Sequence, residues 1–267
     1  MADAGSADEE KRCAYKHENF TCSEKAWPGS RDGFCLYHAT ENGKDQETSL
    51  KVWEYAREKA KKPDPDFTGW HFPDAPADQA FKGVVFDGWA LFVGATFSCV
   101  AWFDNATFQG NALFDHATFH KNALFKRACF NDVAQFVEVT FEKCATFSDA
   151  KFVSGAQFKD AKFLGSAFFT MARFGESASF AGASFHETAS FNGAIAASGI
   201  QVAFDLPHRV TLQSSSATAE EDSKGQSDKK THKTEDAETA KSKKGNKDGQ
   251  KQDKEEVLLP FMRREEG

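Results

Sequence analysis

Several kinds of residue are scarce in this chain of 267 residues. Methionine and tyrosine occur three times each, whereas phenylalanine occurs 28 times. Of these phenylalanines, 22 lie between residues 81 and 194. A chain that draws its large apolar side chains from one residue type in one segment does not have the mixed core of an ordinary globular domain. The distribution predicts a periodic core instead.

Long apolar runs are also missing. The first twenty residues contain no apolar stretch of the kind found in signal peptides, and no segment approaches the roughly 20 apolar residues that a spanning helix needs. We therefore expect a cytoplasmic protein with no membrane contact. The six cysteines should stay reduced in that compartment, which leaves metal binding or packing as their role.

The chain has no strong excess of charge and no recognisable catalytic motif. Its net charge is -7, and residues 81 to 194 hold 10 acidic and 9 basic side chains. Neither a phosphate-binding loop nor a triad pattern is present. His116, His120 and His186 have no evident carboxylate or nucleophile partner in the sequence. We expect no enzymatic activity, and the charge balance disfavours nucleic-acid binding.

Phenylalanine recurs at fixed intervals from Phe81 to Phe191. It occurs 21 times in this series, and after a first step of five residues the spacing alternates between six and five. Alanine stands two positions before each phenylalanine from Phe92 onward, with Val139 as the exception. On a helix with this period the two phenylalanines of a repeat would point about 130° apart. In a strand, both apolar residues of Ala-x-Phe share one face, so the pattern predicts very short strands stacked as a solenoid.

The run GATFSCVAWFDNATFQGNALFDHATF, residues 94–119, resembles the pentapeptide-repeat family, in the variant whose A-x-F units are five and six residues apart. The resemblance implies an all-β solenoid: a right-handed, four-sided parallel β-helix with one unit on each side. Four units make one coil, so the 21 units give about five coils. FTGWHFP, residues 67–73, resembles the lead-in to such repeats. Some family members imitate DNA and inhibit type II topoisomerases, but the near-neutral repeat does not fit that role.

The register of one coil, two spacings of six and two of five, also predicts which outward side chains align. Two sides carry mostly polar residues, and the two others carry large apolar ones, which we expect on neighbouring sides: Leu91, Trp102, Leu113, Leu124 and Phe168. A contiguous exposed apolar patch usually marks a contact surface. One alternative, which we favour, is cover within the chain by the 44–62 helix or the C-terminal VLLPFM. The other is contact with a protein partner or with a second copy in a homodimer.

A group of cysteines and histidines precedes the repeat. Cys13, Cys22, Cys35 and His38 have the spacing C-x8-C-x12-C-x2-H. Three thiolates and one imidazole complete a tetrahedral zinc site without a water position, and so short a segment needs a staple to fold. His17 is a further candidate ligand. The alternative is an aromatic cluster that contains reduced cysteines by coincidence.

The ligand order of this group resembles the plant WRC zinc module, which implies a structural zinc site. Residues 11–38 carry five basic and three acidic side chains, so the module lacks the basic patch of a DNA-binding domain.

Composition divides the chain into six parts. Residues 44–62 are good helix formers, with Leu50, Trp53, Ala56 and Ala60 as the expected apolar stripe. The parts are a Cys/His zinc-type module (11–43), this helix (44–62), a proline-rich connector without regular structure (63–80), the β-helix with a C-terminal cap (81–212), a linker (213–256) and a short apolar motif (257–267).

The last two parts differ in composition. Residues 213–256 contain no apolar side chain larger than alanine, so we expect them to be disordered. Residues 257–267 restore valine, leucine, phenylalanine and methionine. They form either a docking motif or a tail that folds back on its own domain.

These features together predict a non-enzymatic scaffold or protein-interaction protein. The alternative is a nucleic-acid-related regulator that acts through DNA binding by the zinc module or through a topoisomerase.

Overall fold

The structure is a computed structural model that describes residues 11–17, 20–40, 44–74, 80–175, 177–196 and 210–211. The predicted linker (213–256) and apolar motif (257–267) lie outside the described residues. Within the described ranges, no helix combines the length and the apolar character needed to cross a bilayer.

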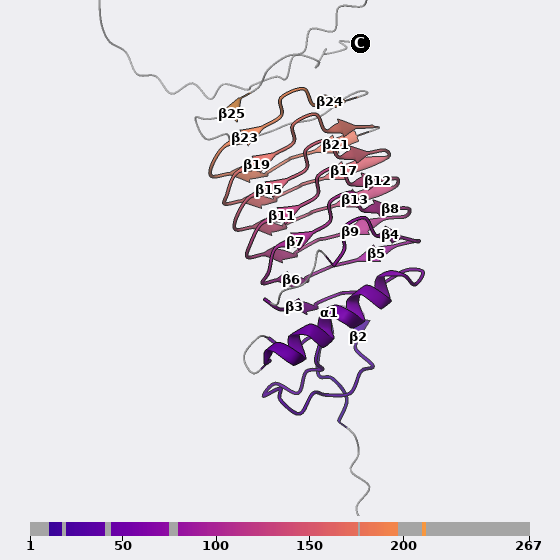
Figure 1. The fold of residues 1–267 in the computed structure, drawn as a ribbon. Coiled ribbons are helices and arrows are strands. Elements are labelled where there is room, and N and C mark those ends of the chain that lie inside the picture. Colours follow the sequence, from indigo (N-terminus) through magenta and orange to yellow (C-terminus); the bar gives the residue numbers. More distant parts are fainter. Residues whose placement is uncertain are drawn as a thin grey trace, which may run out of the picture. The chain divides into compact units, whose positions relative to one another are not determined.

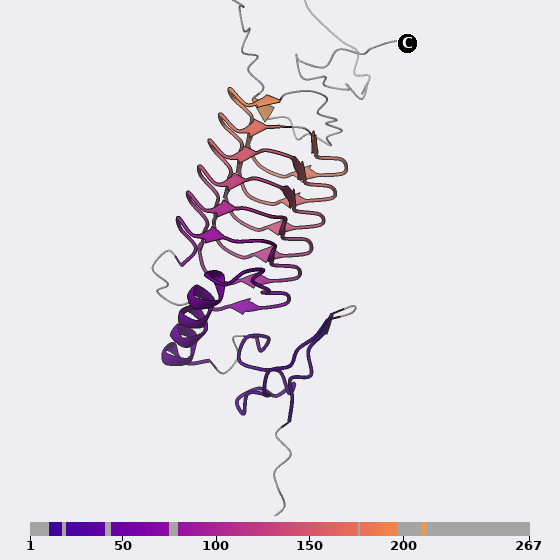
Figure 2. The ribbon, with the colours of Figure 1, turned by 90° about the vertical axis from the view of Figure 1, so that its right-hand side faces the viewer.

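Four parallel sheets form the sides of a β-solenoid (Figures 1 and 2). The chain visits them in a fixed order, which we number I to IV. Side I contains β3 (His71–Phe72), β6 (Thr96–Phe97), β10 (Thr118–Phe119), β14 (Thr140–Phe141), β18 (Lys162–Phe163) and β22 (Ser184–Phe185). Side II contains β7 (Ala101–Trp102), β11 (Ala123–Leu124), β15 (Ala145–Thr146), β19 (Ala167–Phe168), β23 (Ala189–Ser190) and β25 (Val210–Thr211).

The two other sides complete each coil. Side III contains β4 (Val85–Phe86), β8 (Thr107–Phe108), β12 (Cys129–Phe130), β16 (Lys151–Phe152), β20 (Arg173–Phe174) and β24 (Ile195–Ala196). Side IV contains β5 (Ala90–Leu91), β9 (Ala112–Leu113), β13 (Val133–Gln135), β17 (Gly155–Gln157) and β21 (Ser177–Ser179). The predicted four-sided parallel solenoid of about five coils is confirmed.

Phenylalanine rings fill the interior of the solenoid. Strands pair in register with the equivalent residues of the next coil, as Phe119 does with Phe141. Phe136 has no exposed surface, and its ring is stacked between those of Phe114 and Phe158, with centroids 4.9 Å and 4.8 Å away. The alanine of each unit points inward beside the ring, as the period of two requires. The core is thus a continuous column of stacked rings.

Two kinds of corner produce the alternating spacing. In the shorter corner the carbonyl of Phe92 accepts a hydrogen bond from the Ala95 amide at 3.0 Å, and Gly94 between them has a φ of 63°. A turn that needs positive φ at its third residue is a type II turn. The longer corners, such as residues 98–100, hold one more residue. Positive φ recurs every 11 residues, at Gly83, Gly94, Asn105, His116, Arg127, Glu138, Asp149, Asp160, Met171, Gly182 and Gly193.

The solenoid begins earlier than the sequence predicts. Phe67 and Phe72, in the expected connector, are fully buried and stack on Phe92 and Phe97 with centroids 4.8 Å and 4.4 Å apart. The separation along the chain within these two pairs is longer than that of the regular repeat. Extra residues between Phe72 and Phe81 break the spacing, and for this reason the sequence pattern indicates a connector where the structure has a first coil.

The predicted helix is present as α1 (Gln46–Ala60). The Asp45 side chain accepts a hydrogen bond from the Thr48 amide and caps its first turn. Lys61 ends the helix two residues before Pro63, whose ring disfavours helical backbone at the residue before it.

One face of α1 packs on the first coil. Trp53 lies 5.0 Å from Phe72 and 5.9 Å from Phe81 between ring centroids, and its indole N–H donates to the Pro73 carbonyl at 3.1 Å. The predicted stripe is wrong in one member, because Leu50 is 37% exposed and Val52 is buried in its place. The helix therefore closes the N-terminal end of the phenylalanine column.

Candidate metal centre and outer surface

The backbone of the N-terminal module brings its three cysteines together. β1 (Lys16–His17) and β2 (Phe20–Thr21) pair antiparallel, and the Cys13 amide donates to the Glu24 carbonyl at 2.8 Å. Cys13 and Cys22 therefore lie on adjacent segments of a hairpin. The Trp27 amide then donates to the Phe34 carbonyl at 2.9 Å, which closes a loop that returns the chain to Cys35.

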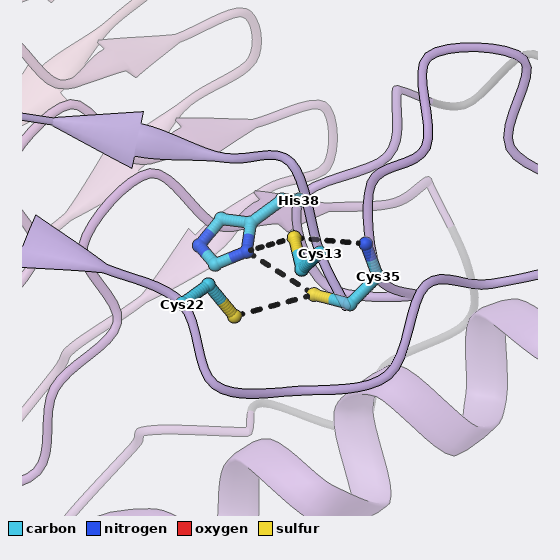
Figure 3. A group of neighbouring side chains, drawn as sticks. All are labelled: Cys13, Cys22, Cys35 and His38. Atoms are coloured by element: carbon cyan, nitrogen blue, oxygen red, sulfur yellow. Dashed lines mark hydrogen bonds between the residues drawn. The ribbon is translucent and has the colours of Figure 1, made fainter. Parts of the chain in front are cut away.

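Four buried donor atoms meet at this point (Figure 3). The sulfur atoms of Cys13, Cys22 and Cys35 and a ring nitrogen of His38 all lie within 4.8 Å of one another. His38 Nδ1 is 3.5 Å from the Cys13 Sγ and 3.1 Å from the Cys35 Sγ. The Cys22 and Cys35 sulfurs are 3.9 Å apart. This spacing allows all four atoms to bind a single metal ion.

The second nitrogen of His38 fixes the orientation of its ring. His38 Nε2 lies 2.9 Å from the Thr68 carbonyl oxygen, which can only accept a hydrogen bond. Nε2 therefore carries the proton, and Nδ1 presents a lone pair to the sulfurs. The Tyr15 ring stacks on the imidazole at 4.0 Å with an interplanar angle of 4°. Burial lowers the pKa of His38, which favours the neutral imidazole that a metal ligand needs.

The thiols have the opposite electrostatic requirement. Burial raises the pKa of Cys22 and Cys35, so the charged thiolates are disfavoured in this site unless a cation is bound. A bound divalent cation reverses this preference and deprotonates coordinating thiols. The Cys35 amide also donates to the Cys13 sulfur at 3.0 Å, which would stabilise a thiolate there. His17 lies on β1 and is not a member of the group.

The module contacts the first coil directly. The Tyr37 ring stacks on Trp70 at 4.3 Å, and the Tyr37 carbonyl accepts from the His71 amide at 2.8 Å. The Tyr15 ring lies against Gly69, where any side chain would collide with it. Together with the bond from His38 to Thr68, these contacts attach the metal centre to the residues that start the solenoid.

Comparison with family models bears on the repeat region. The model for pentapeptide repeats (9 copies) matches residues 81–128 and 153–195. These two stretches thus belong to the pentapeptide-repeat family. Residues 129–152, between the two matches, add further strands to the same four sheets in the same register. No curated protein and no solved structure gives a significant match to this chain.

The repeat domain places the predicted apolar side chains on opposite sides, and the expectation of neighbouring sides is wrong. Leu91 pairs with Leu113 on side IV, whereas Trp102 pairs with Leu124 on side II. Along the chain these four alternate between the two sides, half a coil apart, so consecutive ones face in opposite directions. Phe168 is on side II but is separated from Leu124 by Thr146. All five predicted side chains are partly exposed.

The expected cover by the helix is not what the structure shows, because α1 packs on the end of the solenoid. Cover by the C-terminal VLLPFM concerns residues outside the described ranges. Trp102 has a cation near its ring, with Lys82 Nζ 6.0 Å from the centroid. The pentapeptide-repeat domain therefore offers two small apolar areas, one on side II and one on side IV.

Two histidines of the repeat do have carboxylate partners, contrary to the expectation from the sequence. His116 Nδ1 lies 3.5 Å from a Glu138 oxygen, and His120 Nδ1 lies 2.9 Å from a Glu142 oxygen. In both pairs the residues are one coil apart, so the register itself was the signal that could have identified them. Both pairs are exposed and contain no nucleophile, and such surface pairs contribute at most about 1 kcal/mol.

Proposed function

We propose that this protein is a non-enzymatic interaction scaffold: a rigid four-sided solenoid whose N-terminal end is closed by α1 and by a zinc-stapled module. The observation that carries the proposal is the filled interior. Phe136 and its stacked neighbours have no exposed surface, so the solenoid encloses no space in which a substrate could react. Any function of the repeat domain must then use its outer sides.

The donor set supports zinc as the metal. Three thiolates and one imidazole are typical of structural zinc sites, and four protein ligands leave no position for a reactive water. Cys13, Cys22, Cys35 and Nδ1 of His38 would hold the ion. Bound zinc would supply a cross-link between the hairpin and the segment that contacts Thr68 and Trp70.

Elemental analysis of the purified full chain tests the metal assignment. We expect about one zinc per chain, and a loss of most of it in Cys35→Ser. Cys129→Ser is the matched control, because Cys129 lies on β12 and outside the metal group. Zinc-free protein that keeps a folded N-terminal module would contradict the assignment.

The outer sides favour a protein as the partner. Residues 81–194 carry 10 acidic and 9 basic side chains, a balance that suits neither phosphate binding nor phosphate imitation. The partly exposed apolar residues on sides II and IV offer contact areas for a partner or for a second copy.

The interaction proposal is tested by changing one side at a time. Trp102→Lys with Leu124→Lys alters side II, and Leu91→Lys with Leu113→Lys alters side IV. Light scattering and affinity purification from the cells that express the protein should show loss of self-association or of specific partners in one pair of variants. The melting temperature should stay within a few degrees of the wild type. Unchanged mass and unchanged partners in both pairs would refute the proposal.

A further inference from the structure

The N-terminal module carries a groove that the scaffold function does not use. It has a volume of about 840 Å³, within the range of roughly 300–1,000 Å³ that is usual for ligand clefts. Its apolar lining includes Trp27, Leu36 and Tyr37. The groove lies on the Cys/His module and shares no residue with sides II and IV.

Hydrogen bonds and stacking hold the walls of the groove in place. The Ser30 amide donates to the Trp27 carbonyl at 2.9 Å, and the Phe34 amide donates to the Ser30 hydroxyl at 3.0 Å. Cys35, a member of the Cys/His group, also lines the groove, and Tyr37 is fixed by its stack on Trp70. The groove is therefore preformed, which lowers the ordering cost of binding.

The charges around the groove select the occupant. Lys11, Lys25 and Arg31 line it together with a single carboxylate, that of Glu24. A partly apolar lining with an excess of cations fits an apolar peptide that carries acidic residues beside its apolar side chains.

The chain itself contains an apolar segment with acidic residues on its N-terminal side. Residues 255–264 read EEVLLPFMRR, so two adjacent glutamates precede the apolar residues and two arginines follow them. Pro260 favours extended backbone at Leu259. In an extended segment every second side chain points the same way, which places Val257, Leu259 and Phe261 on one face. That face is apolar and lies next to a negative charge.

The length of the intervening chain permits this contact. The segment from residue 212 to residue 256 can span up to about 150 Å when fully extended. A stack of five or six coils at roughly 4.8 Å per coil is only about 25–30 Å tall. A segment tethered in the same chain also has an effective concentration that is set by the length of the tether. Modest intrinsic affinity is then sufficient for occupancy.

We propose that residues 255–262 bind in the groove of the Cys/His module as an extended peptide. The apolar face of Val257, Leu259 and Phe261 lies on Trp27, Leu36 and Tyr37. Glu255 and Glu256 lie near the lysines at the edge. The segment then occupies the module until a competing acidic, apolar peptide displaces it. This proposal stands apart from the use of sides II and IV and can fail without affecting it.

Zero-length carbodiimide cross-linking of the full chain tests the contact, because it joins an amine to a carboxylate only at salt-bridge distance. We expect cross-links from Lys11 or Lys25 to Glu255 or Glu256, detected by mass spectrometry. Leu259→Asp with Phe261→Asp should reduce their yield at least tenfold. Leu258→Asp, on the other face of the extended segment, is the matched control and should retain most of the yield.

Two further measurements separate the alternatives. A mixture of isotope-labelled and unlabelled chains shows whether cross-links form within one chain, as proposed, or between copies, which would overturn the intrachain contact. Hydrogen exchange of residues 27–37 should be slower in the wild type than in the double aspartate variant. Absence of cross-links together with equal exchange in the two proteins would also overturn the proposal.

Discussion

Replacement of a central phenylalanine is the sharpest test of the ring column. Phe136 is fully buried between Phe114 and Phe158, and it meets Phe125 and Phe147 edge-on at 5.6 Å and 5.4 Å. Phe→Ala changes at buried sites cost about 3–5 kcal/mol in free energy of unfolding. Each aromatic pair adds roughly 0.5–1.5 kcal/mol, although these terms are not additive. We therefore expect Phe136→Ala to fall in the upper half of the range.

Urea denaturation followed by circular dichroism measures this loss, and hydrogen exchange shows whether it is confined to the flanking coils, since repeats contact only their neighbours. Trp89→Ala is the control, because Trp89 is 52% exposed, and it should change stability by at most about 0.5 kcal/mol. A loss below about 1 kcal/mol at Phe136, or an equal loss at Trp89, would refute the reasoning.

Three further tests use substitutions in the corners, at a half-buried carboxylate and in α1, which closes the phenylalanine column. Met171 lies in a corner with a φ of 57°, which is strained for a residue with a side chain and not for glycine, so Met171→Gly should raise the free energy of unfolding by up to about 1 kcal/mol in urea titrations. Arg173→Gly is the control, because Arg173 lies on the strand β20, where glycine should lower the free energy of unfolding by a similar amount. Burial raises the pKa of the Asp115 carboxyl group above its ordinary value of 3.8, so the folded state binds the carboxyl proton more tightly than the unfolded state does. The free energy of unfolding should therefore fall as the pH rises from 3.8 through the raised pKa. Asp115→Asn should remove that fall from unfolding curves measured across this pH range. Trp53→Ala should cost about 3–5 kcal/mol in the same urea assay, and the exposed Leu50→Ala less than about 0.5 kcal/mol; equal effects would mean that α1 does not close the column.

The solenoid was predictable because its core uses a single large residue at a fixed spacing. The Ala-x-Phe pattern specifies both the inward face and the stacking partner one coil away, as the pairing of Phe119 with Phe141 confirms. The spacing between phenylalanines alternates between five and six residues because shorter and longer corners alternate along the chain. Gly94, Gly182 and Gly193 occur at equivalent positions of the repeat, and the structure shows that they mark the positive-φ position of the shorter corner.

The features that could not be predicted from the sequence depend on three-dimensional placement. Extra residues after Phe72 break the spacing, so the first coil resembles a connector. The opposite placement of Leu91 and Trp102, by contrast, does follow from the sequence, because their separation of 11 residues is half of a 22-residue coil, and the expectation of neighbouring sides misread that register. The buried face of α1 includes Val52 instead of Leu50, because the end of the column and not a generic helical stripe decides which side chains are covered.

The candidate metal centre also has a part that the sequence predicted and a part that it did not. Spacing alone identified Cys13, Cys22, Cys35 and His38, and the structure brings all four together while leaving His17 outside the group. The contact of His38 with the Thr68 carbonyl had no signal in the sequence, because nothing in the long segment between them reveals their proximity. This bond leaves Nδ1 as the ring nitrogen that can bind a metal, and it links the module to the solenoid.

Zinc K-edge X-ray absorption on the purified full chain tests the central claim most directly, since it reports both the metal and its ligands. A closed structural site predicts three sulfur neighbours at about 2.3 Å and one nitrogen at about 2.0–2.1 Å, with no oxygen among the ligands. Cys35→Ser should lower the sulfur count or the zinc content. A bound water among the ligands would indicate an open, reactive metal site and would contradict a structural staple at the end of a filled scaffold, as would a chain that binds no zinc.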